Sequence, residues 1–553
     1  MTDHPFAEVA DNLATVEQQL FTAPQERLPE LCLHTAKKVI TACRANPDAA
    51  LAYIKLVDSS ATSSFSLRAC ITVTSLGILQ RTNEHTLQHI LAALVAVQAC
   101  ADKPQEQAFA RLRPLSVFCR QRGLEIWSDL LTIRKALVHP DGVKLLQRPT
   151  LSRWQQLGLV ATYLARHLAR QSLYGCFKPL ATVHTSAPYQ AMLGSLLKSL
   201  SEVSPGSWVN ANNQQALVLA VSGNHTAIQR RSELSAGSNG ALTGEHQWVP
   251  TLSLQPWSAA PLPFHQWWQY YCACQPNRDA SGPGAFPVVF PVNRPPSSLL
   301  KIIDALQLPD TDISELSGMV EREPVFSQFL REAASNDNRL QLPVGNVKQA
   351  ILTYGTERVG DMLTQRALSQ RLTQHQFPLL AQCQTLAVVA AGIAGLLSTH
   401  TRTRFTSQSA ALVTSLLCAP LFMLPALKVM TTLPFKRQAG IQMKDWFTLK
   451  ESQQWPALVS DLAQGWHQSP TWRALLHHAG KHPDDVPRSL RKEHALLLLS
   501  VVWARSWLFA NSQAAESVAG AITASLDVLS LQPDVEKTLR HDLAPQLLCP
   551  LVN

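Results

Sequence analysis

The stretch Asn346–Gly355, NVKQAILTYG, indicates a type of structure more clearly than any other part of the chain. Its apolar and aromatic side chains stand at Val347, Ala350, Ile351 and Tyr354. This i, i+3, i+4, i+7 spacing places them on one face of a helix. The glycine that follows supplies the left-handed residue on which many helices end. We therefore predict a helix that begins at the asparagine-valine step and stops at the glycine.

Signals for further helices lie before this stretch. Asp312 followed by Glu315 predicts a capped start for a helix over Ile313–Arg322, and Pro324 suits the first turn of the next helix. The apolar face of an earlier helix is formed by Leu299, Leu300, Ile302, Ile303 and Leu306. We predict an all-helical C-terminal domain over residues 297–547.

Two long apolar stretches follow at Leu386–Leu397 and Ala411–Leu427. The second is about the lower length limit for a membrane span, but it contains Pro420 and Pro425. Two core helices fit this composition better than a span. We therefore expect no membrane segment.

The first 200 residues also carry apolar side chains at helical spacing, for example Leu87, Ile90, Leu91 and Leu94. They predict a helical domain over residues 1–200. The fold class expected for the chain is mainly α, with two helical bundles and a small strand-containing segment after the first.

That segment begins near Ser207. Trp208-Val209 and Ala216–Val221 are typical of short strands separated by a turn over Asn210–Gln215, and Trp248–Leu254 is a further strand candidate. The glycine-rich SAGSNG at Ser235–Gly240 lacks the Gly-Lys-Ser/Thr of a phosphate loop, so we interpret it as a turn.

Residues 275–296 are rich in Pro, Gly and polar side chains, the composition of an interdomain linker. This bounds the strand-containing extension to residues 201–274. An aromatic cluster precedes the linker and comprises Trp257, Phe264, Trp267, Trp268, Tyr270 and Tyr271. We expect these rings to pack against a domain, although a stacking surface for a base or a peptide is an alternative.

Composition narrows the function classes. The 553 residues are 46% hydrophobic and 16% charged, which indicates a globular protein of two or more domains. The net charge is +9, but the Lys and Arg residues are scattered, so we do not expect nucleic-acid binding. The eleven cysteines lie mostly singly among apolar neighbours, and the chain starts with no secretory signal pattern. We expect a cytoplasmic protein.

Four segments of the C-terminal half carry a resemblance to a known family. They are Pro295-Pro296, Glu323-Pro324, FLREAAS at Phe329–Ser335 and VKQAILTYGTERV at Val347–Val359. They resemble the opening of an HDOD domain, a non-catalytic relative of the HD phosphohydrolases in bacterial signalling proteins. The likeness continues with QTLAVVAAGIAGLL and more weakly to about residue 547. Ala334 stands where the family usually has asparagine.

The N-terminal half resembles a degenerate HD-GYP domain, the type that hydrolyses cyclic di-GMP. The matching segments are SPGSWVNANNQQALVLAV at Ser204–Val221 and HPDG at His139–Gly142, which stands near that family's metal-site signature. Leu159–Leu168 follows as the next helix. The resemblance implies a strand-bearing tail after the helical core.

The resemblance also locates the ligand positions of an HD metal site, which needs several His and Asp side chains converging on one or two metals. In the N-terminal half these positions are occupied by Phe65, Ala96-Val97, Ala136-Leu137-Val138, Val143–Leu146 and Thr162. In the C-terminal half they are occupied by Gln384, Cys418-Ala419 and Arg505. We expect neither half to bind the metals or to be an enzyme.

Other residues that could hold a metal do not form a convincing motif. His85 and His89 lack the Glu of a zincin helix and suit a solvated helix face. We expect an exposed turn for the cluster His477, His478, His482, Asp484 and Asp485, and a surface position for His541-Asp542. Cys272 and Cys274 are a lone C-x-C pair. We predict no catalytic, cofactor-binding or metal-binding residues.

These observations predict a non-catalytic regulatory protein of bacterial signal transduction. The HDOD resemblance implies partner proteins such as a kinase, a response regulator or a nucleotide-signalling enzyme. An alternative is a receptor for cyclic di-GMP or another nucleotide, with Arg68 or Arg134 holding phosphates. A weaker alternative is a residual metal-dependent phosphohydrolase.

Overall fold

The fold is given by a computed structural model. It describes residues 4–56, 63–101, 103–168, 171–183, 186–233, 246–257, 259, 262–276, 284–308, 311–337, 343–436, 438–509, 513–514 and 516–546. The predicted turn Ser235–Gly240 lies outside these residues. The chain forms two compact units. The N-terminal unit is Met1–Val289 with His375–Phe377 and Val429–Thr431, and the C-terminal unit is Phe290–Gln374, Pro378–Lys428 and Thr432–Asn553.

The N-terminal unit is mainly a helical bundle, as predicted. Its helices are α1 (Ala7–Gln19), α2 (Leu28–Ala45), α3 (Pro47–Lys55), α4 (Ser63–Leu79), α5 (Glu84–Gln98), α6 (Gln105–Gln121), α7 (Glu125–Thr132), α8 (Arg134–Val138), the 3-10 helix η1 (Pro140–Gln147), α9 (Arg153–His167), α10 (Leu173–Val183), α11 (Ala187–Ser199) and α12 (Phe264–Cys274). Side-chain caps fix some of the starts. The Asn83 side chain accepts from the His85 N–H before α5, and Ser152 forms a capping box with Gln155 before α9.

A five-stranded antiparallel sheet follows the bundle, in the order β4-β3-β2-β1-β5. The strands are β1 (Trp208–Ala211), β2 (Gln214–Ser222), β3 (His225–Arg230), β4 (Gln247–Pro250) and β5 (Gln255–Pro256). The predicted turn over Asn210–Gln215 was too long. Only Asn212 and Asn213 form it, with φ of 51° and 65°, because two left-handed residues make the tight hairpin turn that matches strand twist. Strand β3 was not predicted. The predicted strand Trp248–Leu254 is interrupted by a 3-10 turn, η3 (Thr251–Ser253).

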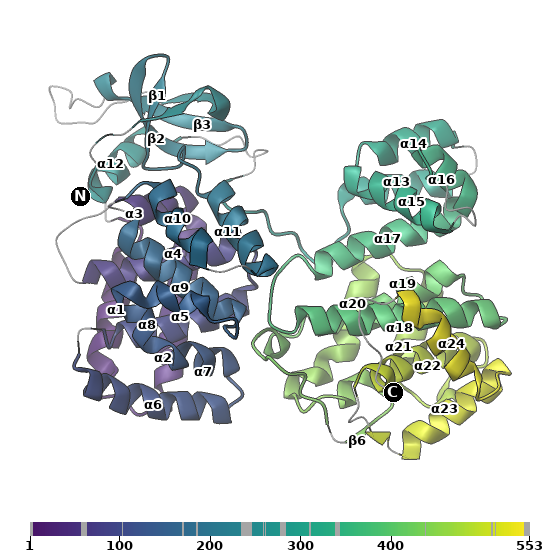
Figure 1. Cartoon of the computed structure of the whole chain (residues 1–553). Coiled ribbons are helices and arrows are strands. Elements are labelled where there is room, and N and C mark those ends of the chain that lie inside the picture. The colour runs from purple at the N-terminus through teal and green to yellow at the C-terminus, as the bar shows by residue number, and fades with distance from the viewer. Residues whose placement is uncertain are drawn as a thin grey trace. The chain divides into compact units, whose positions relative to one another are not determined.

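The two faces of this sheet pack in different directions. Leu217 and Leu219 of β2 belong to the core of the helical bundle, whereas Ala216 and Val218 belong to a small separate core. This alternation is the two-residue period of a strand. Figure 1 shows the sheet at one end of the bundle, with α12 beside it. The strand-bearing segment is therefore joined to the bundle by its own apolar side chains.

Helix α12 carries most of the aromatic cluster that the sequence contains. Trp267 is fully buried, and its indole N–H donates to the Val218 carbonyl at 3.0 Å. Phe264 is also buried and meets the ring of Tyr53 on α3 edge-on, with centroids 4.7 Å apart. Trp257 stands apart at 42% exposed. The cluster thus packs within the N-terminal unit, as expected, apart from Trp257.

The C-terminal unit is built from helices with minor additions. They are α13 (Ser297–Gln307), α14 (Ile313–Glu321), α15 (Pro324–Asp337), α16 (Val347–Tyr354), α17 (Thr356–Leu372), α18 (Leu380–His400), α19 (Ser407–Cys418), η4 (Ala419–Phe422), η5 (Ala426–Lys428), η6 (Met443–Asp445), η7 (Lys450–Gln454), α20 (Trp455–Gly465), α21 (Pro470–His478), η8 (Pro483–Asp485), α22 (Arg491–Leu508), α23 (Glu516–Leu529), α24 (Val535–Leu543) and η9 (Ala544–Gln546). Figure 1 shows α13 to α16 grouped on one side of α17, and α18 to α24 on the other.

The predicted helix signals act as expected. The Asp312 carboxylate accepts from the Ser314 N–H at the start of α14, and the Asn346 side chain accepts from the Gln349 N–H at the start of α16. Gly355 ends α16 with φ of 79°. The prediction of an all-helical domain was wrong in one detail. A two-residue parallel pair, β6 (Gln438–Ala439) and β7 (Gln513–Ala514), lies in this unit.

The two apolar stretches have different structures. Among the described residues only α18 is long and apolar enough to cross a membrane by length and composition, and 50% of its most apolar window is buried inside the protein. The other stretch, Ala411–Leu427, is not one helix, because α19 ends at Cys418 and the 3-10 turns η4 and η5 follow.

Gly142 provides a test of the packing in the N-terminal unit. A Cβ at this position would overlap the Ala136 carbonyl oxygen, so Gly142→Ala forces η1 away from α8. We expect a loss of about 2–4 kcal/mol in the free energy of unfolding, measured by urea denaturation. Gly194→Ala is the control, because nothing lies within 4 Å of its added Cβ. An equal loss in both variants would contradict the packing described.

Candidate functional site

Among the positions that the HDOD resemblance assigns to metal ligands, Cys418-Ala419 and Arg505 are buried in the C-terminal unit, whereas Gln384 is half-buried. Cys418 ends α19 and Ala419 begins η4, and neither side chain is exposed. Burial raises the pKa of the Cys418 thiol to about 12, so it stays protonated, whereas metals bind the thiolate. Arg505 on α22 is also buried, with its guanidinium carbon 4.8 Å from the Phe435 ring centroid and 5.1 Å from that of Trp446. These groups offer poor metal ligands.

A buried lysine that the sequence did not reveal lies in the same interior. Lys428 is 4% exposed, and its ammonium group donates to the Phe422 carbonyl. Burial lowers the pKa of Lys428 to about 7, an effect that the neighbouring Cys383 thiol opposes. Cys383 also lies close enough to Cys418 to add to the rise in that thiol's pKa. A nitrogen donor with partial positive charge therefore occupies a region where a metal site would need acceptors.

In the N-terminal unit, a cation lies among the residues at the assigned ligand positions. Ala96 and Val97 near the end of α5 are buried, and Phe65 on α4 is half-buried. The guanidinium carbon of Arg166 lies 4.7 Å from the Phe65 ring centroid, and its Nη2 donates to the Val138 carbonyl at 2.7 Å. Burial lowers the pKa of Arg166. Residues of α4, α8 and α9 thus meet around one guanidinium.

A cavity of about 590 Å³ opens among α5, α6, α8 and η1 of the N-terminal unit. Val97 and Ala136, two of the assigned ligand positions, line its wall, as does His139 of the HPDG segment. Only one of the two arginines named as phosphate-binding candidates lies at this cavity. Arg134 lines the cavity, whereas Arg68 does not, is only 7% exposed and donates to the Leu56 carbonyl at 3.5 Å.

A groove of about 810 Å³ runs along α18 in the C-terminal unit, bordered by α17 and α19. Gln384, the residue at the first assigned histidine position, lies in its wall. Val388, one turn further along α18, is 60% exposed. Gln365 on α17 donates to the Ser415 hydroxyl on α19 at 3.2 Å. The groove therefore has an apolar face on α18 and polar groups on α17 and α19.

The prediction of a solvated helix face for His85 and His89 holds only for His85, which is exposed. His89 is half-buried, and its Nδ1 accepts from the Trp127 indole N–H at 3.2 Å. Burial lowers the pKa of His89 to about 4. His89 is half-buried because Trp127 of α7 packs against this face of α5, and local sequence does not reveal that contact.

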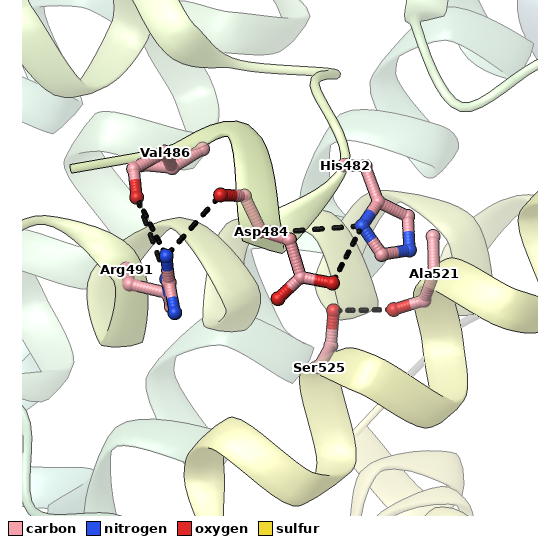
Figure 2. Close-up of polar contacts among 6 residues, drawn as sticks. All are labelled: His482, Asp484, Val486, Arg491, Ala521 and Ser525. Carbon is pink, nitrogen blue, oxygen red and sulfur yellow. Dashed lines mark hydrogen bonds and ion pairs between the residues drawn. The ribbon is translucent and has the colours of Figure 1, made fainter. Parts of the chain in front are cut away.

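The residues around His482 form a capped turn, which Figure 2 shows. The His482 Nδ1 accepts from the Asp484 N–H at 3.4 Å and lies 3.3 Å from its carboxylate. The guanidinium of Arg491 donates to the carbonyls of Asp484 and Val486. Asp484 and Asp485 are exposed, as expected for a surface turn. His477 and His478 instead lie on helix α21, and His478 and His482 are half-buried, so the prediction of an exposed turn was wrong for these residues. His541 and Asp542 are exposed too, with Nδ1 and Oδ1 3.5 Å apart.

His494 is a buried histidine that sequence reasoning missed. It lies on α22 and is 1% exposed, and it lines a hollow of about 340 Å³. Its Nε2 is 3.1 Å from the His478 carbonyl, so the ring proton sits there, and its buried Nδ1 has no hydrogen-bond partner. Protonation would leave a second N–H without an acceptor. Burial accordingly lowers the pKa of His494 to about 4.

In the described parts of the chain, Cys and other potential metal-ligand side chains do not cluster into a metal site. Cys272 on α12 is half-buried, and Cys274 on the same helix is buried. No group of three or more His, Cys, Asp or Glu side chains within the described ranges is close enough to hold a metal ion.

His494 leads to a prediction about acid stability. The folded state holds its pKa at about 4, and the unfolded chain returns it to about 6.5. The unfolded state therefore binds the proton more tightly, and the free energy of unfolding decreases as pH falls from about 6.5 to about 4. The stability that neutral His494 provides is complete only above pH 6.5. Between about pH 7.5 and pH 4.5 the wild-type protein should lose about 2–3 kcal/mol more than His494→Gln in denaturant titrations. Identical pH dependence in the two proteins would contradict this.

Comparisons with known proteins identify one part of the chain. Residues 292–418 match the model of the HDOD domain family. A solved HDOD domain protein of unknown function from Geobacter sulfurreducens is 14% identical, and the match covers 47% of this chain and 89% of that one with a TM-score of 0.33. No curated protein matches. The N-terminal HD-GYP resemblance and the predicted extent to residue 547 stay predictions. The C-terminal unit of this chain thus contains an HDOD domain at residues 292–418.

Proposed function

We propose that this chain is a non-catalytic regulatory protein of bacterial signalling, and that its HDOD domain acts by binding other proteins. The observation that carries the proposal is the chemistry around Cys418 and Ala419. An HD hydrolase needs His and Asp ligands that hold a metal, lower the pKa of a bound water and neutralise charge on a phosphate. Here the corresponding side chains are a protonated thiol and a methyl group.

The buried lysine strengthens the argument. The ammonium group of Lys428 donates to a main-chain carbonyl, and its pKa of about 7 leaves it partly charged at neutral pH. A divalent cation placed beside it would meet electrostatic repulsion in a medium of low dielectric constant. Phosphohydrolase activity would therefore require both new ligands and displacement of this group.

A binding role is supported by the groove along α18. It is large enough for several side chains of a partner, at about 810 Å³. Its floor includes the small residues Ala387, Ala391 and Gly392, and Val388 exposes most of its side chain. Apolar surface of this kind favours association with another protein. We propose a kinase, a response regulator or a nucleotide-signalling enzyme as the partner class.

A charge placed in the groove tests this role. Val388→Asp should lower the affinity of the full chain for its partner at least about tenfold, because a carboxylate would be buried at the contact. The partner is first captured from the host lysate by cross-linking, and its affinity is then measured with purified proteins.

Leu352→Asp is the matched control, since Leu352 is 61% exposed on α16 and lies outside the groove. We expect its affinity to stay within about twofold of the wild-type value. Equal losses in the two variants, or no specific partner for the wild-type chain, would count against the proposed role.

A further inference from the structure

The cavity of the N-terminal unit combines an apolar wall with unneutralised positive charge. Val97, Leu112, Ala136 and Val138 contribute to the wall. Its volume of about 590 Å³ falls within the roughly 300–1,000 Å³ of small-molecule sites. An apolar wall of this extent suits a ring system or another apolar body.

Three cationic side chains line the same cavity: Lys103, Arg134 and Lys135. Within the described residues none of them forms an ion pair. The one lining carboxylate, Asp141, lies 3.2 Å from the ammonium of Lys144, which is not a lining residue. The cavity thus carries an excess of positive charge that its own acidic residue does not balance.

Arg134 is held in place before any ligand arrives. Its guanidinium carbon lies 4.9 Å from the centroid of the Phe109 ring, and its Nη1 donates to the Leu131 carbonyl at 3.1 Å. A guanidinium has five N–H groups, so this single hydrogen bond leaves several for a ligand. A planar fork fixed in this way suits the oxygens of a phosphate.

Two further donors border the cavity. The His139 Nδ1 accepts from the Asp141 N–H at 3.1 Å, so the neutral ring carries its proton on Nε2 and can donate it. Helix α6 begins next to the cavity after Pro104 without a side-chain cap, and Gln105 of its first turn is a lining residue. The N–H groups of that turn add positive potential.

From these contacts we propose that the cavity binds an organic phosphate with a flat apolar body, and that the ligand is a nucleotide. The phosphate contacts Arg134 and Lys135, and the base lies against the wall that contains Val97 and Val138. The site lies wholly in the N-terminal unit. It does not depend on the protein-binding role of the HDOD domain.

Calorimetry on the full chain tests the ligand class. The probes are GMP and AMP, cyclic di-GMP, the nucleosides guanosine and adenosine, and inorganic phosphate. We expect at least one nucleotide to bind at least about tenfold more tightly than its nucleoside and than phosphate alone, because both parts of the site are then filled. Tighter binding of cyclic di-GMP than of GMP would identify a two-base ligand, and the reverse a mononucleotide. Absence of binding by all nucleotides, or equal affinity for GMP and guanosine, would overturn the proposal.

Two arginines on the same ring provide a matched pair of variants. Arg113 lies 5.6 Å from the Phe109 centroid but does not line the cavity. Arg134→Gln should weaken nucleotide binding about tenfold or more, whereas Arg113→Gln should change it less than about twofold. Lys135→Gln, an exposed position, gives a second reading if Arg134→Gln fails to fold. Equal effects of Arg134→Gln and Arg113→Gln would show a diffuse charge effect and overturn the site.

Discussion

The close packing of α18 against α19 and α22 is the constraint on which the C-terminal unit depends. Small buried residues, Ala390 and Ala394 on α18 and Ala410 on α19, allow the helices to approach closely. The interior they enclose holds Cys383, Cys418 and Lys428, and burial lowers the pKa of the Lys428 ammonium group. Such an interior is stabilised by apolar burial, whereas an HD metal centre concentrates carboxylates that repel one another until a metal binds.

Each unit contains a cationic side chain that donates to a main-chain carbonyl. In the N-terminal unit the guanidinium of Arg166 lies on Phe65 and donates to the Val138 carbonyl. In the C-terminal unit the ammonium of Lys428 donates to the Phe422 carbonyl. Each cation binds a main-chain oxygen close to positions that the family resemblances assign to ligands. Each of these contacts links two helical segments through a main-chain oxygen.

Sequence reasoning was most successful where structure is decided locally. Asp312, Asn346 and Gly355 act on the backbone of their own helix ends, so their roles follow from residue type and spacing. The turn at Asn212-Asn213 was predicted too long. The polar composition of Asn210–Gln215 indicates a loop, whereas two left-handed asparagines are enough to close the hairpin. Strand β3 was missed because its residues alone do not show the alternation of a strand, and its pairing with β2 is a contact between segments.

The candidate sites were predicted less completely. Arg134 could be named as a phosphate-binding candidate, but the cavity around it needs α5, α6 and η1 together. Burial lowers the pKa of His89, Lys428 and His494, and no local motif marks these residues as buried. A lysine in a helical sequence normally indicates a solvated position. Burial of Lys428 was therefore beyond what residue type or spacing could predict.

The most direct test of the central claim is the amount of manganese that the full chain retains after loading with the metal and gel filtration, assayed together with phosphodiester hydrolysis. If buried side chains have replaced the HD metal centres, the metal content and the hydrolysis rate should both equal those of a blank. One or two manganese ions per chain with metal-dependent hydrolysis would contradict the account.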